Sequence, residues 1–194
     1  MKVVPRPPVL PGRGALRLTP YGGRAGTVEI RRAMVADMPA IVRLNGDVQR
    51  LHAAAHRGLF KPAGERDEII SWFVMALAKP DAHLLIGTVE GELVGYISGQ
   101  VIPYPENPFR YPLKIGLVDQ LSISPAFQRR GYGEALLDAL LAIFRAAEID
   151  RVELSVWAFN DSARRFYERR GFATVQHRMS LEFSAPKPLA TTNI

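Results

Sequence analysis

The chain has 194 residues, of which 47% are hydrophobic, a formal net charge of +6 and no cysteine. This length supports one domain with a sizeable core, and the lack of cysteine excludes disulfides, thiol nucleophiles and thiolate metal sites. No apolar run approaches the roughly 18 residues that span a membrane, and the N-terminus lacks a secretory signal, so we expect a cytoplasmic protein.

Residues 1–27 hold most of the excess charge. They are rich in Pro and Gly, contain no acidic residue, and carry five basic ones: Lys2, Arg6, Arg13, Arg17 and Arg24. Subtracting this +5 from the total of +6 leaves +1 for the rest, which argues against nucleic acid as the main partner. We predict an N-terminal extension over residues 1–27, loosely draped or packed on a partner subunit, a folded domain over 28–183 and a tail over 184–194.

The first half of the domain predicts a strand, two helices and a hairpin. Alternation indicates a strand at residues 28–31, and Asp37 can cap a helix that continues to about Gly58. A second amphipathic helix is expected over residues 65–77, followed by paired strands at 83–89 and 93–101. His52 and His56 have the spacing of a metal pair, but no third ligand lies at a telling distance, so no metal site is predicted.

A proline-rich loop over residues 103–112 leads into a central strand over 115–123. Period-two counting places Asp119 on the same face as Leu117 and Leu121. A carboxylate on an apolar face has a raised pKa and becomes a candidate general base, whereas a β-bulge would expose it.

The stretch after this strand has the character of a phosphate-binding turn. A basic loop with glycines leads into a helix over residues 131–147, and the amide end of a helix attracts anions. Gly131 and Gly133 let a ligand approach the backbone closely. Leu136 stands where a dinucleotide fingerprint needs glycine, and Glu134 follows the second glycine where a nucleotide P-loop needs lysine.

The remaining residues predict a parallel crossover and a closing strand. A strand over 151–157 follows the helix, which makes strand–helix–strand a right-handed parallel unit. Asn160 is a good N-cap for a short helix that ends at Gly171. We predict a last strand over residues 174–183 that completes the sheet.

Two segments carry a resemblance to a known family. The run from Gln128 to Gly133 (QRRGYG) resembles the Q/R-x-x-G-x-G/A loop of the GNAT superfamily of acyl-coenzyme A-dependent N-acetyltransferases. About 30 residues later, the run from Asn160 to Phe172 (NDSARRFYERRGF) resembles the N-x-x-A-x-x-F/Y-Y-x-x-x-G-F segment of the same superfamily. The resemblance covers residues 28–183 and implies a single α/β domain: a twisted mixed sheet with splayed central strands, flanked by helices.

The resemblance also implies a cofactor site and an acid. Acetyl-CoA is the expected co-substrate, and no metal is expected. Tyr167 corresponds to the general acid that protonates the leaving thiolate. Residues expected to bind the coenzyme, through the pantetheine arm or the diphosphate, are Leu121, Ser122, Ile123, Gln128, Arg129, Arg130, Gly131, Tyr132, Gly133, Glu134 and Asn160.

The sequence does not decide which residue is the general base or which amine is the acceptor. Relatives that acetylate protein N-termini often carry a Glu five residues before the Asn, where this chain has Ser155. Asp119, Glu153 or a water chain could replace it. The acceptor is expected to be a small-molecule or peptide amine, bound near the 103–112 loop and the two histidines by a monomer or homodimer. The alternative function is a non-catalytic acyl-CoA-binding regulatory or sensor domain.

Overall fold

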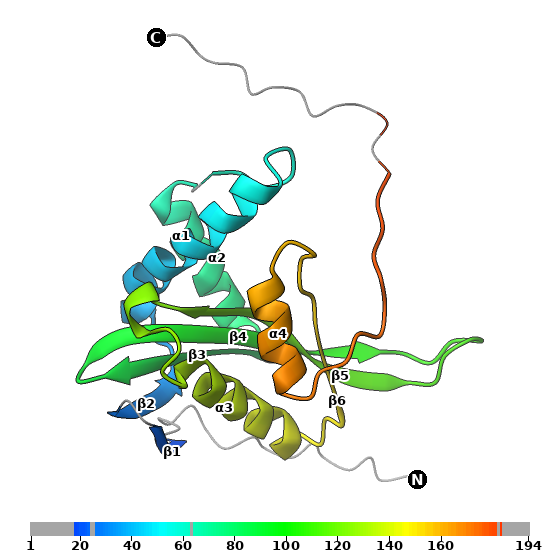
Figure 1. Cartoon of the computed structure of the whole chain (residues 1–194). Coiled ribbons are helices and arrows are strands. Elements are labelled where there is room, and N and C mark those ends of the chain that lie inside the picture. Colours follow the sequence, from blue (N-terminus) through cyan, green and yellow to red (C-terminus); the bar gives the residue numbers. More distant parts are fainter. Residues whose placement is uncertain (1–17, 24–25, 63, 182, 184–194) are drawn as a thin grey trace.

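A computed structural model describes the chain except for residues 1–17, 24–25, 63, 182 and 184–194. Its centre is one six-stranded sheet in the order β1-β2-β3-β4-β5-β6 (Figure 1). Neighbouring strands run antiparallel except β5 and β6, which are parallel, so the sheet is mixed. The strands are β1 (Leu18–Gly23), β2 (Gly26–Arg32), β3 (Ala82–Val89), β4 (Glu92–Tyr104), β5 (Leu113–Ile123) and β6 (Arg151–Leu154).

Helices cover both faces of this sheet. α1 (Met38–Ala55) and α2 (Arg66–Ala78) lie on one face, where Met38, Ile41 and Phe73 pack against Leu84, Ile86 and Tyr96. α3 (Tyr132–Ala146) lies on the other face, and α4 (Asp161–Arg169) lies beside it (Figure 1). Two short 3-10 turns, η1 (Val35–Asp37) and η2 (Pro125–Phe127), precede α1 and follow β5.

α3 supplies most of the core on its face. Leu136, Leu137, Leu140 and Phe144 are fully buried against the sheet, following the helical spacing of apolar residues in the sequence. Gly116 on β5 makes room for this helix, because a Cβ there would stand 2.5 Å from the Phe144 ring. The helix is therefore held tightly to the strand that it follows.

β5 and β6, the last two strands in the sheet order, diverge partway along β5. They pair only from Ile115 with Arg151 to Val118 with Leu154. Beyond Val118, β5 continues beside β4 to Ile123, whereas the chain after Leu154 is no longer a strand. This confirms the splayed strands that the family resemblance implies. Among the described residues, no strand pairs with residues 119–123 on the side away from β4.

The structure differs from the expected elements at both ends of the domain. Residues 18–23 of the predicted N-terminal extension form β1 and pair with β2, while residues 1–17 lie outside the described part. The predicted last strand over 174–183 is wrong, since its described residues form no strand. β6 is also shorter than predicted, and Asp37 does not cap α1: its carboxylate accepts from Met34 N at 2.7 Å and pairs with Arg31 instead.

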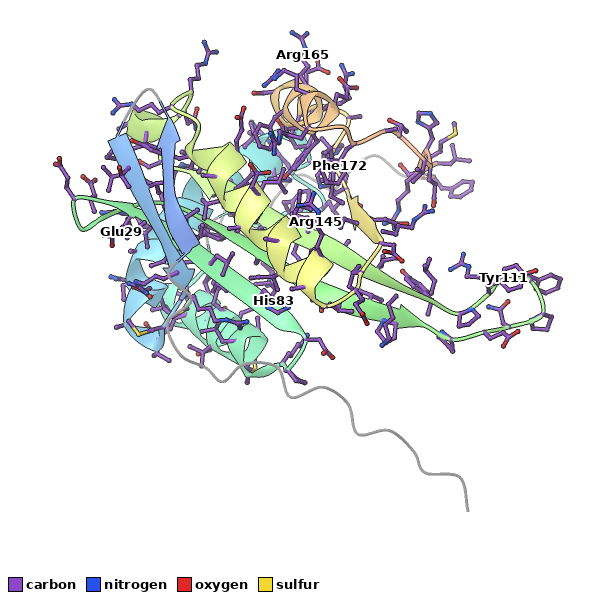
Figure 2. All side chains as sticks on the ribbon, turned by 90° about the horizontal axis from the view of Figure 1, so that it is seen from below. Glu29, His83, Tyr111, Arg145, Arg165 and Phe172 are labelled. Atoms are coloured by element: carbon purple, nitrogen blue, oxygen red, sulfur yellow. The ribbon has the colours of Figure 1, made fainter. Side chains whose placement is uncertain are left out.

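The β4–β5 hairpin is longer than predicted, because β4 continues to Tyr104. The hairpin forms an arm that projects beyond the helices, with Tyr111 near its tip (Figure 2). Phe109 and Tyr111 are 98% and 86% exposed. The aromatic loop over residues 103–112 is thus directed into solvent.

Candidate active site

The basic loop between β5 and α3 has the backbone conformation of an anion-binding turn. Arg129 has φ of 60° and Gly131 has φ of 85°, so two left-handed residues flank Arg130. Gly131 is the N-cap of α3 and directs the amide end of the helix toward this loop. Successive amides in a turn of this kind, together with the helix dipole, favour a bound anion.

The two glycines leave space above this turn. A Cβ on Gly131 would meet no atom within 4 Å, and a Cβ on Gly133 would meet only Ile123 and Phe166, at 3.6 Å or more. Packing within the protein therefore does not require glycine at position 133. A ligand that approaches the first turn of α3 supplies a reason for it.

The side chains around the turn differ in exposure and in their contacts. Arg129 and Arg130 are exposed, and the Arg130 guanidinium lies 5.4 Å from the centre of the Phe127 ring. Tyr132 is 3% exposed and packs in the core, so it can serve a coenzyme only through its backbone. Glu134 lies in the first helical turn, partly exposed, where its charge interacts favourably with the helix dipole.

On the side of β5 that faces away from β4, its last residues present peptide groups rather than side chains. Leu121 and Ile123 pack toward α3, and the buried Ser122 hydroxyl donates to the Leu44 carbonyl at 3.3 Å. The Gln128 amide donates to the Ile123 carbonyl at 3.2 Å, which ties the loop to the strand end. Coenzyme contacts predicted for these three strand residues would therefore be made by their peptide groups.

α4 brings a capping amide and a partly buried phenol to the same region. Asn160 Oδ1 accepts from Ala163 N at 3.1 Å, which confirms the predicted cap and leaves the Asn160 amide nitrogen as its donor. Tyr167 packs beside the rings of Phe166 and Phe172, with the cluster that includes Leu121. Burial raises the pKa of Tyr167 to about 12, so its phenol stays protonated at neutral pH.

Asp119 lies at a β-bulge. Gln120 pairs with Ser98 and Val118 with Gly99, so Asp119 is the extra residue of β5. The bulge moves its side chain off the apolar face and onto the exposed surface, where Gln100 Nε2 donates to the carboxylate at 3.2 and 3.3 Å. Desolvation by the surrounding chain still raises its pKa, against the opposing effects of Gln100 and Lys79.

A polar triangle beside this bulge was not predicted from the sequence. Tyr96 OH donates to Gln120 Oε1 at 2.8 Å, and Asn45 Nδ2 lies 3.1 Å from the Tyr96 oxygen and 3.2 Å from Gln120 Oε1. Burial raises the pKa of Tyr96 to about 12. The triangle connects α1 to the strand just before Leu121, and these isolated polar residues carry no sequence signal that would join them.

An aromatic cluster connects the end of α1 to the loop after β6. His52 lies 5.0 Å from Phe60 and 5.5 Å from Phe159, and His56 lies 5.1 Å from Trp157, all between ring centres. His52 Nδ1 is 2.8 Å from the Val48 carbonyl. The spacing of the two histidines indicated their common face, and Phe60 follows them closely in the chain, whereas Trp157 and Phe159 come from about 100 residues further on.

The described part of the chain offers no group of three or more His, Asp or Glu side chains placed to hold a metal ion. Among those same residues, no helix combines the length and the apolar character needed to cross a bilayer. Two hollows, of about 440 and 490 Å³, lie elsewhere, on the stem of the β4–β5 hairpin and beside the start of α1.

Comparison with curated proteins finds two informative relatives. The chain is 45% identical over 60 residues to a mycothiol acetyltransferase of Beutenbergia cavernae, a match that covers 31% of this chain and 20% of that protein. It therefore spans about a fifth of that relative's length. It is 27% identical over 150 residues to an N-alpha-acetyltransferase of Sulfurisphaera tokodaii, covering 76% of this chain and 81% of that one.

Solved structures share the fold. The tetramutant of the BH1408 protein from Bacillus halodurans superposes with a TM-score of 0.74 at 25% identity, covering 79% of this chain and 99% of that one. A predicted acetyltransferase with acetyl-CoA from Clostridium acetobutylicum gives a TM-score of 0.62 at 17% identity, covering 80% and 96%. Residues 46–172, which include the glycine turn, the parted strands and α4, match the acetyltransferase (GNAT) family, and the chain belongs to that family.

Proposed function

We propose that the protein is an N-acetyltransferase that passes the acetyl group of acetyl-CoA to a primary amine within a ternary complex. The observation that supports this most is the parting of β5 and β6 beside the amide end of α3, with the Tyr167 phenol in the same packed cluster. A relative named for N-alpha-acetylation and a structural neighbour with acetyl-CoA support the amine acceptor and the donor. We place this activity in the cytoplasm.

In the proposed reaction, the amine nitrogen attacks the thioester carbonyl carbon, the C–N bond forms and the C–S bond breaks. The coenzyme leaves as a thiolate, a group with an ordinary pKa of about 8.5. Tyr167 remains a proton donor across this range because its pKa is about 12. Its phenol would donate a hydrogen bond to the departing sulfur and pass it a proton, and the phenolate, which is the stronger base, would recover a proton from solvent to complete the cycle.

The amine must also lose a proton, and Asp119 is the carboxylate that we assign to this step, directly or through water. Glu153 Oε1 forms an ion pair with Arg151 Nε at 2.6 Å, and the side chain of Ser155 has no basic group. A carboxyl group with a raised pKa is a better base than an ordinary one. The cluster of His52, Phe60 and Trp157 would form one wall for the acceptor.

The decisive test measures thiol release from acetyl-CoA with a panel of small amines and peptides, together with calorimetric binding of the coenzyme. Tyr167→Phe should lower kcat by about 100-fold or more while coenzyme affinity stays within about threefold, because only the acid is removed. Trp72→Phe, on the exposed side of α2, is the matched control and should change neither.

Three outcomes separate the alternatives. Unchanged turnover in Tyr167→Phe would remove this phenol from the mechanism. Coenzyme binding without turnover on any amine would favour a non-catalytic acyl-CoA-binding domain. Absence of both binding and thermal shift with acetyl-CoA would contradict the proposal as a whole.

A further inference from the structure

The polar triangle beside Asp119 leaves two hydrogen-bonding atoms unused. Tyr96 OH donates to Gln120 Oε1, and Asn45 Nδ2 lies within 3.2 Å of both of these oxygens. These contacts use the amide nitrogen of Asn45 and the amide oxygen of Gln120. Among the residues that the structure describes, Asn45 Oδ1 and Gln120 Nε2 have no hydrogen-bond partner. Both side chains are partly exposed, so one acceptor and one donor stay available close together.

These two atoms lie on the acceptor side of the proposed reaction centre. Gln120 follows Asp119, the proposed base, and precedes Leu121, where we expect the coenzyme. Desolvation raises the pKa of Asp119, and the charge of Lys79, directly after α2, opposes this rise, so the carboxylate is on the sheet face that α1 and α2 cover. Asn45 belongs to α1 and contacts the same face. The unused donor and acceptor are therefore next to the carboxylate that would receive the proton of the amine.

α1 connects this pair of atoms to the aromatic cluster. Ser122 Oγ donates to the Leu44 carbonyl at 3.3 Å, which holds the helix to β5 directly beside Asn45. Further along α1, His52 contacts Phe159 in the loop after β6, with 5.5 Å between ring centres. The helix rises about 10 Å between these two points, the length of about three residues of extended peptide. In Figure 1 this stretch of α1 leads from the sheet toward the loop before α4.

We infer that the chain selects the N-terminus of a peptide as its acceptor, because Gln120 Nε2 and Asn45 Oδ1 bind the C=O and N–H of the second peptide residue. This inference rests on the proposed acetyl transfer. In an extended chain the N–H and C=O of one residue point to the same side, so a peptide matches a donor beside an acceptor. A polyamine offers only donors and leaves Gln120 Nε2 without a partner. The side chains of the peptide would lie against the aromatic cluster.

The experiment compares two acceptors that differ at one carbonyl. One is a tetrapeptide with a free N-terminus, and the other is the same peptide with the C=O of its second residue reduced to CH2. The attacking amine and the first peptide bond are the same in both. Thiol release from acetyl-CoA gives kcat/KM for each. Wild type should prefer the unreduced peptide by about tenfold or more, because the reduced one leaves Gln120 Nε2 unpaired.

Gln120→Glu tests the donor itself. It removes the amide nitrogen but keeps an oxygen that accepts from Tyr96 and Asn45, so the triangle is preserved. The preference for the unreduced peptide should fall by about tenfold, because the variant offers no donor to that carbonyl. Gln49→Glu is the matched control on α1, since the Gln49 amide already donates to the Lys61 carbonyl at 2.6 Å, and it should keep the wild-type preference. Comparing ratios between the two acceptors cancels any general loss of activity.

The outcomes separate this inference from the proposed function. A wild-type protein that acetylates both peptides, or a simple diamine, equally well would overturn backbone recognition and leave acetyl transfer standing. A Gln120→Glu protein with the wild-type preference would overturn the role of Gln120. Coenzyme binding without acetylation of any amine would overturn acetyl transfer and this inference with it. Circular dichroism checks that Gln120→Glu folds, and the wild-type comparison decides the question without it if it does not.

Discussion

Gly133→Ala should strengthen the fold and weaken coenzyme binding at the same time. The added methyl would meet Ile123 at 3.6 Å and Phe166 at 3.7 Å, which are ordinary contact distances. Gly133 is the second residue of α3 and does not have a positive φ. Alanine is favoured over glycine within helices by up to about 1 kcal/mol, so we expect a gain of roughly 0.5 kcal/mol at this terminal position.

For a chain of this size, that gain corresponds to a rise in Tm of about 1–2 °C. The same methyl enters the space where we place the coenzyme diphosphate. Displacing a close backbone contact by one methyl should raise the Kd for acetyl-CoA by about tenfold or more, equivalent to about 1.4 kcal/mol.

Gly131→Ala is the informative comparison, because Gly131 has a φ of 85°. Alanine in this left-handed conformation costs about 1–2 kcal/mol, so Tm should fall by about 2–8 °C even without ligand. Differential scanning calorimetry and calorimetric titration measure both quantities. A Gly133→Ala protein that binds acetyl-CoA as tightly as wild type would refute our placement of the diphosphate.

Further predictions concern packing and pH. Gly116→Ala would place a methyl 2.5 Å from the Phe144 ring and should lower stability by about 1–3 kcal/mol in denaturant titrations; an unchanged midpoint would contradict the tight packing. Burial lowers the pKa of His83 in the folded chain below its value of 6.5 in the unfolded chain. The unfolded chain is therefore protonated first as pH falls below that value, and the free energy of unfolding decreases. His83→Phe should reduce this loss of stability between pH 7.5 and 5. Identical stability–pH profiles for the variant and wild type would exclude His83 as the cause. Desolvation raises the pKa of Asp119, so its folded form favours the proton and its contribution to stability is lost as pH rises above 3.8. Asp119→Asn should therefore be more stable than wild type at pH 7 but not at pH 3, and a constant difference would contradict this sign.

The sequence predicted the C-terminal half of the site best, because its signals there are local. Asn160 caps α4 within three residues, and the apolar spacing of α3 matches its buried face. The turn before α3 was also predictable from its glycines. Each of these features depends on neighbours in the chain, so pattern and propensity suffice.

Long-range pairing accounts for what the sequence did not predict. The bulge at Asp119 depends on the register between β4 and β5, and one inserted residue reverses the face that period-two counting assigns. The aromatic cluster joins residues about 100 positions apart. Residues 174–183 have the alternation of a strand, but alternation alone does not supply a pairing partner, and the described residues of this segment form no strand.

The position of α3 has a consequence for how the protein responds to its coenzyme. Its first turn is the proposed diphosphate clamp, while Leu136, Leu140 and Phe144 further along the same helix are the centre of the core. Coenzyme bound at the clamp should therefore stabilise the whole domain against unfolding, and not only a local loop. At a coenzyme concentration of 100 times Kd, the folded state gains about 2.7 kcal/mol, so the melting temperature reports directly on saturation. In a cell, a fall in the acetyl-CoA pool would shorten the lifetime of the folded enzyme as well as slow its turnover.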